Sequence, residues 1–235
     1  IYIMSEISGD IRADQFEDEH VFKTLGSMEA IKEIQQNNGE KGANRYIISN
    51  NQSGLNVMQV FAMLKLTAFK EHLTVDIVPL FETVDDLIHA AGIMEQLYSN
   101  KAYRNHVKSR GNKQTIMLGF SDGTKDGGYL MANWSIFKAK EELTKISRKH
   151  NIKAIFFDGR GGPPARGGGK THQFYASLGP TIENEEVQLT IQGQTISSNF
   201  GTADSAQYNL EQLISSGVSN QFFDSAKNTF KEQQK

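Results

Sequence analysis

The side chains with the clearest chemical potential lie in a glycine-rich loop that directly follows an apolar run. The sequence of this loop, over residues 156–169, is FFDGRGGPPARGGG, and it contains Arg160 and Arg166. Glycine allows positive φ angles and close approach of the backbone to a ligand, and the arginine guanidinium is a fixed fork of donors that matches phosphate or carboxylate oxygens. The pattern predicts an anion-binding loop at the end of a strand. The alternatives are a flexible linker or an RNA-binding tract, although such a tract is typically longer, repeated and basic.

Two carboxylates follow other apolar runs in the same way. Glu82 comes after the run at 74–80, and Asp122 after the run at 115–120. If these runs are parallel strands, the two side chains meet at one edge of the sheet, where their hard oxygen donors suit Mg²⁺ or Mn²⁺. The alternative is that Glu82 belongs to a helix cap and Asp122 to a glycine-rich turn. Lys125 is a candidate point-charge partner for an anion.

The elements that position these residues alternate between strands and helices. Short apolar or β-branched runs predict strands at 46–49, 74–80, 115–120, 154–157 and 187–191. Helical spacing predicts helices at 21–34, 53–69 and 131–150, a helix capped by Thr83 with Asp86, and two more within 205–234. This order indicates an α/β protein with a parallel sheet, either a barrel or an open doubly wound sheet. In both architectures the functional groups lie at the carboxyl ends of the strands.

The composition excludes several classes of protein. The 235 residues carry a net charge of −2 and include no cysteine, which excludes disulfides, zinc–thiolate sites and thiol nucleophiles. A charge this balanced argues against a nucleic-acid-binding surface, and the apolar runs are too short to span a membrane. The sequence therefore predicts a soluble cytoplasmic protein with no nucleic-acid or membrane partner.

Four motifs in order give the chain a family resemblance. The loop is similar to the pattern F-H-G-R-G-G-x-x-G-R-G-G followed by T-H or A-H, here ending in Thr171-His172; the other motifs lie at 79–87, at 119–127, and from Gln192-Gly193 to Phe200-Gly201. Over roughly residues 46–220 the chain resembles the carboxyl-terminal catalytic half of the phosphoenolpyruvate carboxylases. Four ordered motifs are far more specific than any one of them.

The resemblance implies a (β/α) barrel portion of a helix-rich enzyme that condenses phosphoenolpyruvate with bicarbonate, giving oxaloacetate and inorganic phosphate. It implies Mg²⁺ or Mn²⁺ as cofactor, with Glu82 and Asp122 as its ligands. It also implies that Arg160 and Arg166 hold the phosphoryl or carboxyphosphate group, and that Lys125 lies near the same anions. The remaining substrate-binding positions that it implies are Gly161, Gly162, Gly167, Gly168 and Gln192. The complete enzyme is expected to be a cytoplasmic homotetramer.

The chain departs from the family at three points. Asp158 stands where the family has histidine, and an aspartate can act as a catalytic base but cannot add positive charge. Residues 163–165, Pro-Pro-Ala, stand in place of a small-residue spacer and stiffen the loop, and Gln194 stands where glutamate is common.

The family's upstream histidine and arginine motifs are not found in this sequence, which predicts that the 235 residues are a fragment, weakly active or inactive alone. Within a single partial barrel domain at 1–235, we expect a helical lead-in at 1–45, barrel units at 46–204 and terminal helices at 205–235. Two other functions stay open: another barrel enzyme that uses phosphoenolpyruvate or phosphate, and an inactive regulatory or interaction domain on the same scaffold.

Overall fold

The sheet is parallel, and its strands are ordered as they occur in the chain. A computed structural model describes residues 11–159, 170–179, 181–191 and 193–222. Its five strands are β1 (Arg45–Ile48), β2 (Asp76–Phe81), β3 (Lys113–Gly119), β4 (Lys153–Gly159) and β5 (Val187–Leu189), in the order β1-β2-β3-β4-β5. A doubly wound sheet reverses its strand order at a switch point, and no reversal occurs among these five strands. The described part is therefore a portion of a parallel α/β barrel, and all five predicted strands are confirmed to within two residues at each end.

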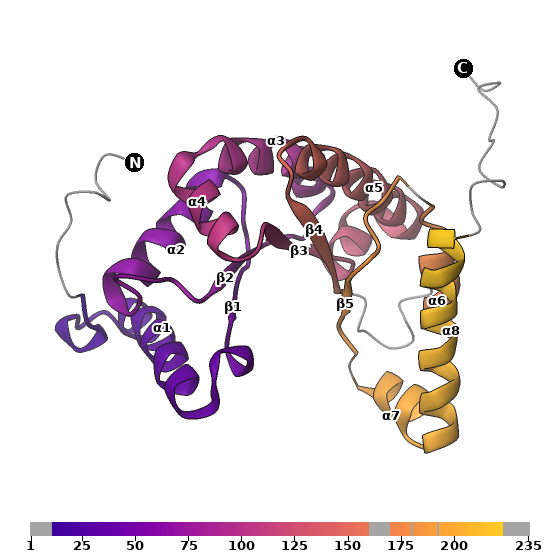
Figure 1. The fold of residues 1–235 in the computed structure, drawn as a ribbon, viewed down its shortest axis with the longest axis horizontal. Coiled ribbons are helices and arrows are strands. Elements are labelled where there is room, and N and C mark those ends of the chain that lie inside the picture. Colours follow the sequence, from indigo (N-terminus) through magenta and orange to yellow (C-terminus); the bar gives the residue numbers. More distant parts are fainter. Residues whose placement is uncertain (1–10, 160–169, 180, 192, 223–235) are drawn as a thin grey trace.

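Helices follow the strands and cover their outer side. Figure 1 shows α2, α4, α3 and α5 following one another in an arc beside the strands, with α1 at one end and α6, α7 and α8 at the other. Their bounds are α1 (Glu19–Asn38), α2 (Gly54–Thr67), α3 (Val84–Ser99), α4 (Lys101–Ser109), α5 (Ser121–Lys149), α6 (Thr171–Ala176), α7 (Gln194–Phe200) and α8 (Ala203–Phe222), and two short 3₁₀ turns lie at Ala13–Gln15 and Glu40–Gly42. None of the helices in the described ranges is long and apolar enough to cross a membrane.

The predicted helices are present, with three differences. The helix expected at 131–150 begins at Ser121 and is interrupted at Gly128, where φ is 77° and ψ is 169°. Helices α4 and α7 were not predicted, because α4 is polar with few apolar positions and α7 has only seven residues. The terminal segment forms α8 as far as Phe222, and its remainder lies outside the described residues. The division of the chain at residues 45 and 204 stays a prediction.

The core lies between the strands and the outer helices. Ala154, Ile155 and Phe156 of β4 are consecutive and each at most 3 % exposed, as expected for a strand covered on both faces. Helices α3 and α5 pack against each other, and Met94 and Leu143 are among their side chains in the core. This packing fixes the strands whose carboxyl ends carry the predicted site.

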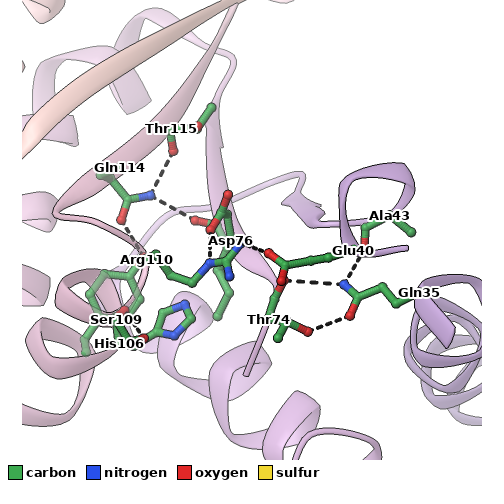
Figure 2. A network of polar contacts seen from close by, with 12 residues as sticks. Gln35, Glu40, Ala43, Thr74, Asp76, His106, Ser109, Arg110, Gln114 and Thr115 are labelled. Atoms are coloured by element: carbon green, nitrogen blue, oxygen red, sulfur yellow. Dashed lines mark hydrogen bonds and ion pairs between the residues drawn. The ribbon is translucent and has the colours of Figure 1, made fainter. Parts of the chain in front are cut away.

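A polar network occupies the opposite, amino end of the sheet. Arg110 donates to Asp76, the first residue of β2, at 2.6 Å, and its guanidinium lies 2.8 Å from Glu40. Figure 2 shows Arg110 between these two carboxylates, with Gln35 and Thr74 hydrogen-bonded to each other beside them. The Arg110 side chain is only 13 % exposed. The network ties the loops before β1, β2 and β3 together.

Candidate active site

Glu82 is held at the carboxyl end of β2 with its carboxylate turned toward the end of β1. The cap of α3 is formed by its neighbours, since Thr83 Oγ1 accepts from Asp86 N at 3.1 Å and Asp86 Oδ2 accepts from Thr83 N at 3.0 Å. The Glu82 carboxylate takes no part in that pair. Its Oε1 instead accepts the backbone N–H of Asn50 at 3.1 Å. The predicted Thr83–Asp86 cap is confirmed, and the Glu82 carboxylate is not its acceptor.

Two glycines let the next strand and helix approach Glu82 closely. A Cβ atom at Gly119, the last residue of β3, would lie 3.1 Å from Glu82 Cα, and one at Gly123 would lie 3.4 Å from the Glu82 carbonyl oxygen. The first of these distances is too short for an ordinary contact, so a larger residue would push the β3 end away. The backbone from 119 to 123, which includes Asp122, therefore passes directly beside Glu82. The side chain of Asp122 lies outside the described part of the structure.

Lys125 belongs to the same short helical segment at the start of α5. It follows Asp122 by three residues, before the interruption at Gly128, and its side chain is exposed. The structure thus places the predicted lysine on the first turns of the helix that begins at the β3 end, and its role toward an anion stays a prediction.

The donor set for a metal ion is only partly within the described residues. Among them no group of three or more histidine, aspartate or glutamate side chains could hold an ion. Mg²⁺ and Mn²⁺ are commonly bound through one or two carboxylates, with water and substrate at the other positions. Glu82 supplies one half-buried carboxylate of this kind at this end of the sheet. The side chain of Asp122 lies outside the described residues, so the metal-ligand pair Glu82 and Asp122 stays a prediction.

Asp158, at the end of β4, is completely buried and firmly held. Its Oδ2 accepts from Lys140 Nζ at 2.8 Å and from the Tyr175 hydroxyl at 2.6 Å, while Oδ1 has no hydrogen-bond partner among the described residues. Lys140 and Asp158 are both 0 % exposed. The loop motif in the sequence includes Asp158 but not Lys140 or Tyr175. These two residues lie 18 and 17 residues from Asp158 in the chain, so no local pattern links them to it.

The remaining predicted site residues lie outside the described residues. These are Arg160, Gly161, Gly162, Arg166, Gly167 and Gly168 of the loop, and Gln192. The described flanks place the loop between the end of β4 and the start of α6 at Thr171. The roles of these residues stay predictions.

Asn51 is a further polar residue at this end of the sheet that the sequence did not reveal. It follows β1 and is 0 % exposed, yet neither its amide nitrogen nor its amide oxygen has a hydrogen-bond partner in the described ranges. Its neighbour Asn50 has a φ of 51° and donates its N–H to Glu82. Buried amides are nearly always hydrogen-bonded, so Asn51 is a candidate for contact with water or substrate. The only sequence signal is a pair of asparagines directly after a strand.

Comparison with known proteins gives one consistent result. The family model described as phosphoenolpyruvate carboxylase matches residues 10–234. The phosphoenolpyruvate carboxylase of Nitrosomonas eutropha is 39 % identical over 209 residues, which cover 86 % of this chain and 22 % of that protein. That of Nitrosomonas europaea is 37 % identical over 209 residues, with the same coverage of 86 % and 22 %. That of Corynebacterium diphtheriae is 36 % identical over 196 residues, covering 83 % and 21 %. The chain spans about a fifth of the length of these relatives.

Proposed function

The chain belongs to the phosphoenolpyruvate carboxylase family, and from this premise we propose that it forms part of an enzyme that carboxylates phosphoenolpyruvate with bicarbonate to oxaloacetate and inorganic phosphate. The proposal rests on the position of the Glu82 side chain. Its carboxylate lies at the carboxyl end of β2, and Gly119 and Gly123 bring the start of α5 against it. This is the end of a parallel barrel at which catalytic groups gather.

The proposed reaction has three steps, all of which move negative charge. A bicarbonate oxygen attacks phosphorus, and the bond between phosphorus and the enol oxygen breaks, which yields carboxyphosphate and the enolate of pyruvate. The bond between the carboxyl carbon of carboxyphosphate and its bridging oxygen then breaks, which gives CO₂ and inorganic phosphate, and the carboxyl proton passes to the phosphate. Finally the enolate carbon forms a bond to CO₂ and gives oxaloacetate. Such chemistry is promoted mainly by fixed positive charge and by exclusion of water.

The proposed roles follow from this need for positive charge. Arg160 and Arg166 would hold the phosphoryl group in bidentate fashion, and Lys125 would add a further cation at the start of α5. The glycines of the loop and Gln192 would bring backbone and amide donors close to the substrate. Glu82 and Asp122 would hold a Mg²⁺ or Mn²⁺ ion, which would supply charge that stabilises the enolate oxygen. From the family we further infer a cytoplasmic homotetramer for the complete enzyme.

The test uses the complete native polypeptide. We expect it to form oxaloacetate from phosphoenolpyruvate and bicarbonate in the presence of Mg²⁺, measured by coupled reduction of oxaloacetate with NADH. The 235-residue chain alone is expected to give little or no turnover, because the family's upstream histidine and arginine motifs are not in its sequence. Turnover by the short chain equal to that of the complete polypeptide would contradict this expectation.

Metal binding separates an active enzyme from an inactive scaffold. Titration with Mn²⁺, followed by its electron paramagnetic resonance signal, should show one site in the native protein and none in Asp122→Ala. Native protein that binds neither Mn²⁺ nor phosphoenolpyruvate would favour the inactive regulatory or interaction domain instead. Phosphate transfer to a nucleotide without formation of oxaloacetate would favour another phosphate-using barrel enzyme.

A further inference from the structure

Three buried side chains from different elements meet under the end of β4. Asp158 is the second-last residue of β4, Lys140 lies in the middle of α5, and Tyr175 lies in α6. Both donors converge on one oxygen, Asp158 Oδ2, at 2.8 Å from Lys140 Nζ and 2.6 Å from the Tyr175 hydroxyl. We call these three residues the Lys140 unit.

Aromatic rings surround the lysine of this unit. Its Nζ lies 5.2 Å from the ring centroids of Phe156 and Phe174 and 5.7 Å from that of Tyr175. Ring faces attract an ammonium group, but they replace little of the hydration that the ammonium loses on burial. A buried charge is tolerated when it is paired and hydrogen-bonded. The salt bridge to Asp158 is therefore the contact that compensates the buried Lys140 ammonium.

The Lys140 unit joins the elements that carry the proposed active site. Asp158 comes two residues before Arg160 in the sequence. Helix α5, which holds Lys140, begins beside Glu82 with the segment of Asp122 and Lys125. Helix α6, which holds Tyr175, is the first described element after the arginine loop. The unit therefore makes direct hydrogen bonds from β4 to α5 and to α6, and β4 and α6 are the two described elements on either side of the loop in the sequence.

We propose that Lys140 and Tyr175 are positioning residues that hold Asp158 as a fixed, charge-compensated carboxylate, so that Asp158 takes no proton in the reaction. This inference rests on the proposed function, since it assigns roles within the same site. Two donors on Oδ2, one of them a charged ammonium, fix the orientation of the carboxylate and compensate its charge, while Oδ1 has no hydrogen-bond partner among the described residues. Without the ammonium, a buried negative charge at this end of the sheet would repel phosphoenolpyruvate and bicarbonate, which are both anions.

The experiment is a double-mutant cycle in the complete native polypeptide. The variants are Lys140→Met, Asp158→Asn and the double variant, with kcat and KM measured for oxaloacetate formation and unfolding followed in urea. Lys140→Met leaves an uncompensated carboxylate, and we expect the KM for phosphoenolpyruvate to rise about 100-fold with a smaller change in kcat. The double variant carries neither charge, and we expect its KM to return to within about 10-fold of the native value.

Two further variants sharpen the interpretation. Tyr175→Phe removes one donor from Oδ2 and should raise KM only a few-fold. Lys138→Met is the matched control, because Lys138 is two residues away on the same helix, is 49 % exposed and pairs with Glu141; it should leave kcat and KM unchanged. A merely structural role would lower the urea midpoint in Lys140→Met without the selective rise in KM.

A catalytic role of Asp158 as a proton acceptor predicts a different result for the same variants. If Asp158 is a proton acceptor in the reaction, Asp158→Asn and the double variant should both lose kcat about 1,000-fold, with no rescue, and this would overturn the proposal. If Lys140→Met does not fold, the double variant still decides, because its kcat is retained under the proposal and lost under the alternative. Native protein that forms no oxaloacetate would instead refute the proposed function, while the urea midpoints would still report whether Lys140 and Asp158 stabilise each other.

Discussion

Polar side chains at the two ends of the sheet differ in how completely they are paired. At the amino end, Arg110 is bonded to both Asp76 and Glu40, and the pairing is complete within the network (Figure 2). At the carboxyl end, the buried Asn51 amide and one oxygen of Asp158 have no partner among the residues described. In barrels of this kind the amino end mainly stabilises the fold and the carboxyl end carries function. Buried polar atoms without a partner in the described ranges also occur on the helices, at Thr67 Oγ1 and Arg104 Nη1. The contrast therefore applies to the Arg110 network and the residues at or just after the carboxyl ends of the strands, where Asn51 and Asp158 can accept further polar contacts.

Glycines serve different purposes at the two ends. At the amino end Gly111 has a φ of 80°, and a Cβ atom there would meet nothing within 4 Å, so its role is to adopt a turn conformation. At the carboxyl end Gly119 and Gly159 leave space, because a Cβ atom on either would lie 3.1 Å from neighbouring backbone. The first kind of glycine shapes a loop, and the second kind brings strand ends together around a site.

The largest expected effect tests the carboxyl end directly. Glu82→Gln keeps the size of the side chain and removes its charge, and we expect kcat/KM for oxaloacetate formation to fall about 1,000-fold, as for other losses of charge stabilisation. The matched control is Glu40→Gln at the amino end, whose side chain is 45 % exposed. It should leave kcat/KM unchanged. Equal losses in the two variants would remove the distinction between the ends.

The second prediction concerns the pH dependence of stability at the amino end. Burial lowers the pKa of His106, in α4, to about 4 from its ordinary 6.5. The unfolded chain therefore binds a proton more readily than the folded protein does. The contribution of neutral His106 to the free energy of unfolding is complete above pH 6.5 and is lost as the pH falls toward 4. Its size is about 3 kcal/mol. Urea unfolding of the complete polypeptide between pH 7.5 and 4.5 should show this loss, and His106→Gln should reduce it.

A surface histidine provides the control for that measurement. His89 on α3 has a side chain that is 62 % exposed. His89→Gln should leave the pH dependence of the unfolding free energy as it is in the native protein. If the unfolding free energy of His106→Gln depends on pH as strongly as that of the native protein, the buried imidazole is not the cause of this dependence.

The third prediction concerns the ionic network. Arg110→Met keeps much of the apolar stem but leaves Asp76 and Glu40 without their shared cation. We expect the free energy of unfolding to fall by about 2 kcal/mol, because a partly buried hydrogen-bonded carboxylate loses its partner. The activity of the folded fraction should not change. Loss of kcat with unchanged stability would place Arg110 in the functional machinery and contradict the comparison.

The smallest effect tests the close approach at Glu82. Gly119→Ala places a Cβ atom 3.1 Å from Glu82 Cα, so the two backbones must move apart by a few tenths of an ångström. We expect kcat/KM to fall about 10-fold through misplacement of Glu82, with little change in stability. Gly92→Ala in α3 is the control, because a Cβ atom there meets nothing within 4 Å. It should stabilise the helix by roughly 0.5–1 kcal/mol and leave activity unchanged.

Much of the fold could be predicted because local patterns dominate it. Runs of apolar and β-branched residues are strong signals for buried strands, and Thr83 with Asp86 is a capping pair that acts within four residues. Helix α4 was missed because its fixed position comes from a few buried residues, such as Tyr103 and Val107, within a polar sequence. The kink at Gly128 was also missed, since a single glycine in a helical pattern does not reveal its φ angle.

The sequence by itself determined the class of fold, the family and the position of Glu82 at a strand end, because these depend on periodicity and on ordered motifs. Only the tertiary structure decided that the strands follow barrel order and that the Glu82 carboxylate turns toward Asn50. It alone also revealed the partners of Asp158. Lys140 lies in the sequence between Lys138 and Glu141, in a charged helical stretch that resembles a solvated face. Its burial arises because α5 packs on β4 and because its ammonium lies against Phe174 and Tyr175 of α6. Long-range contacts of this kind cannot be seen in the periodicity of the sequence.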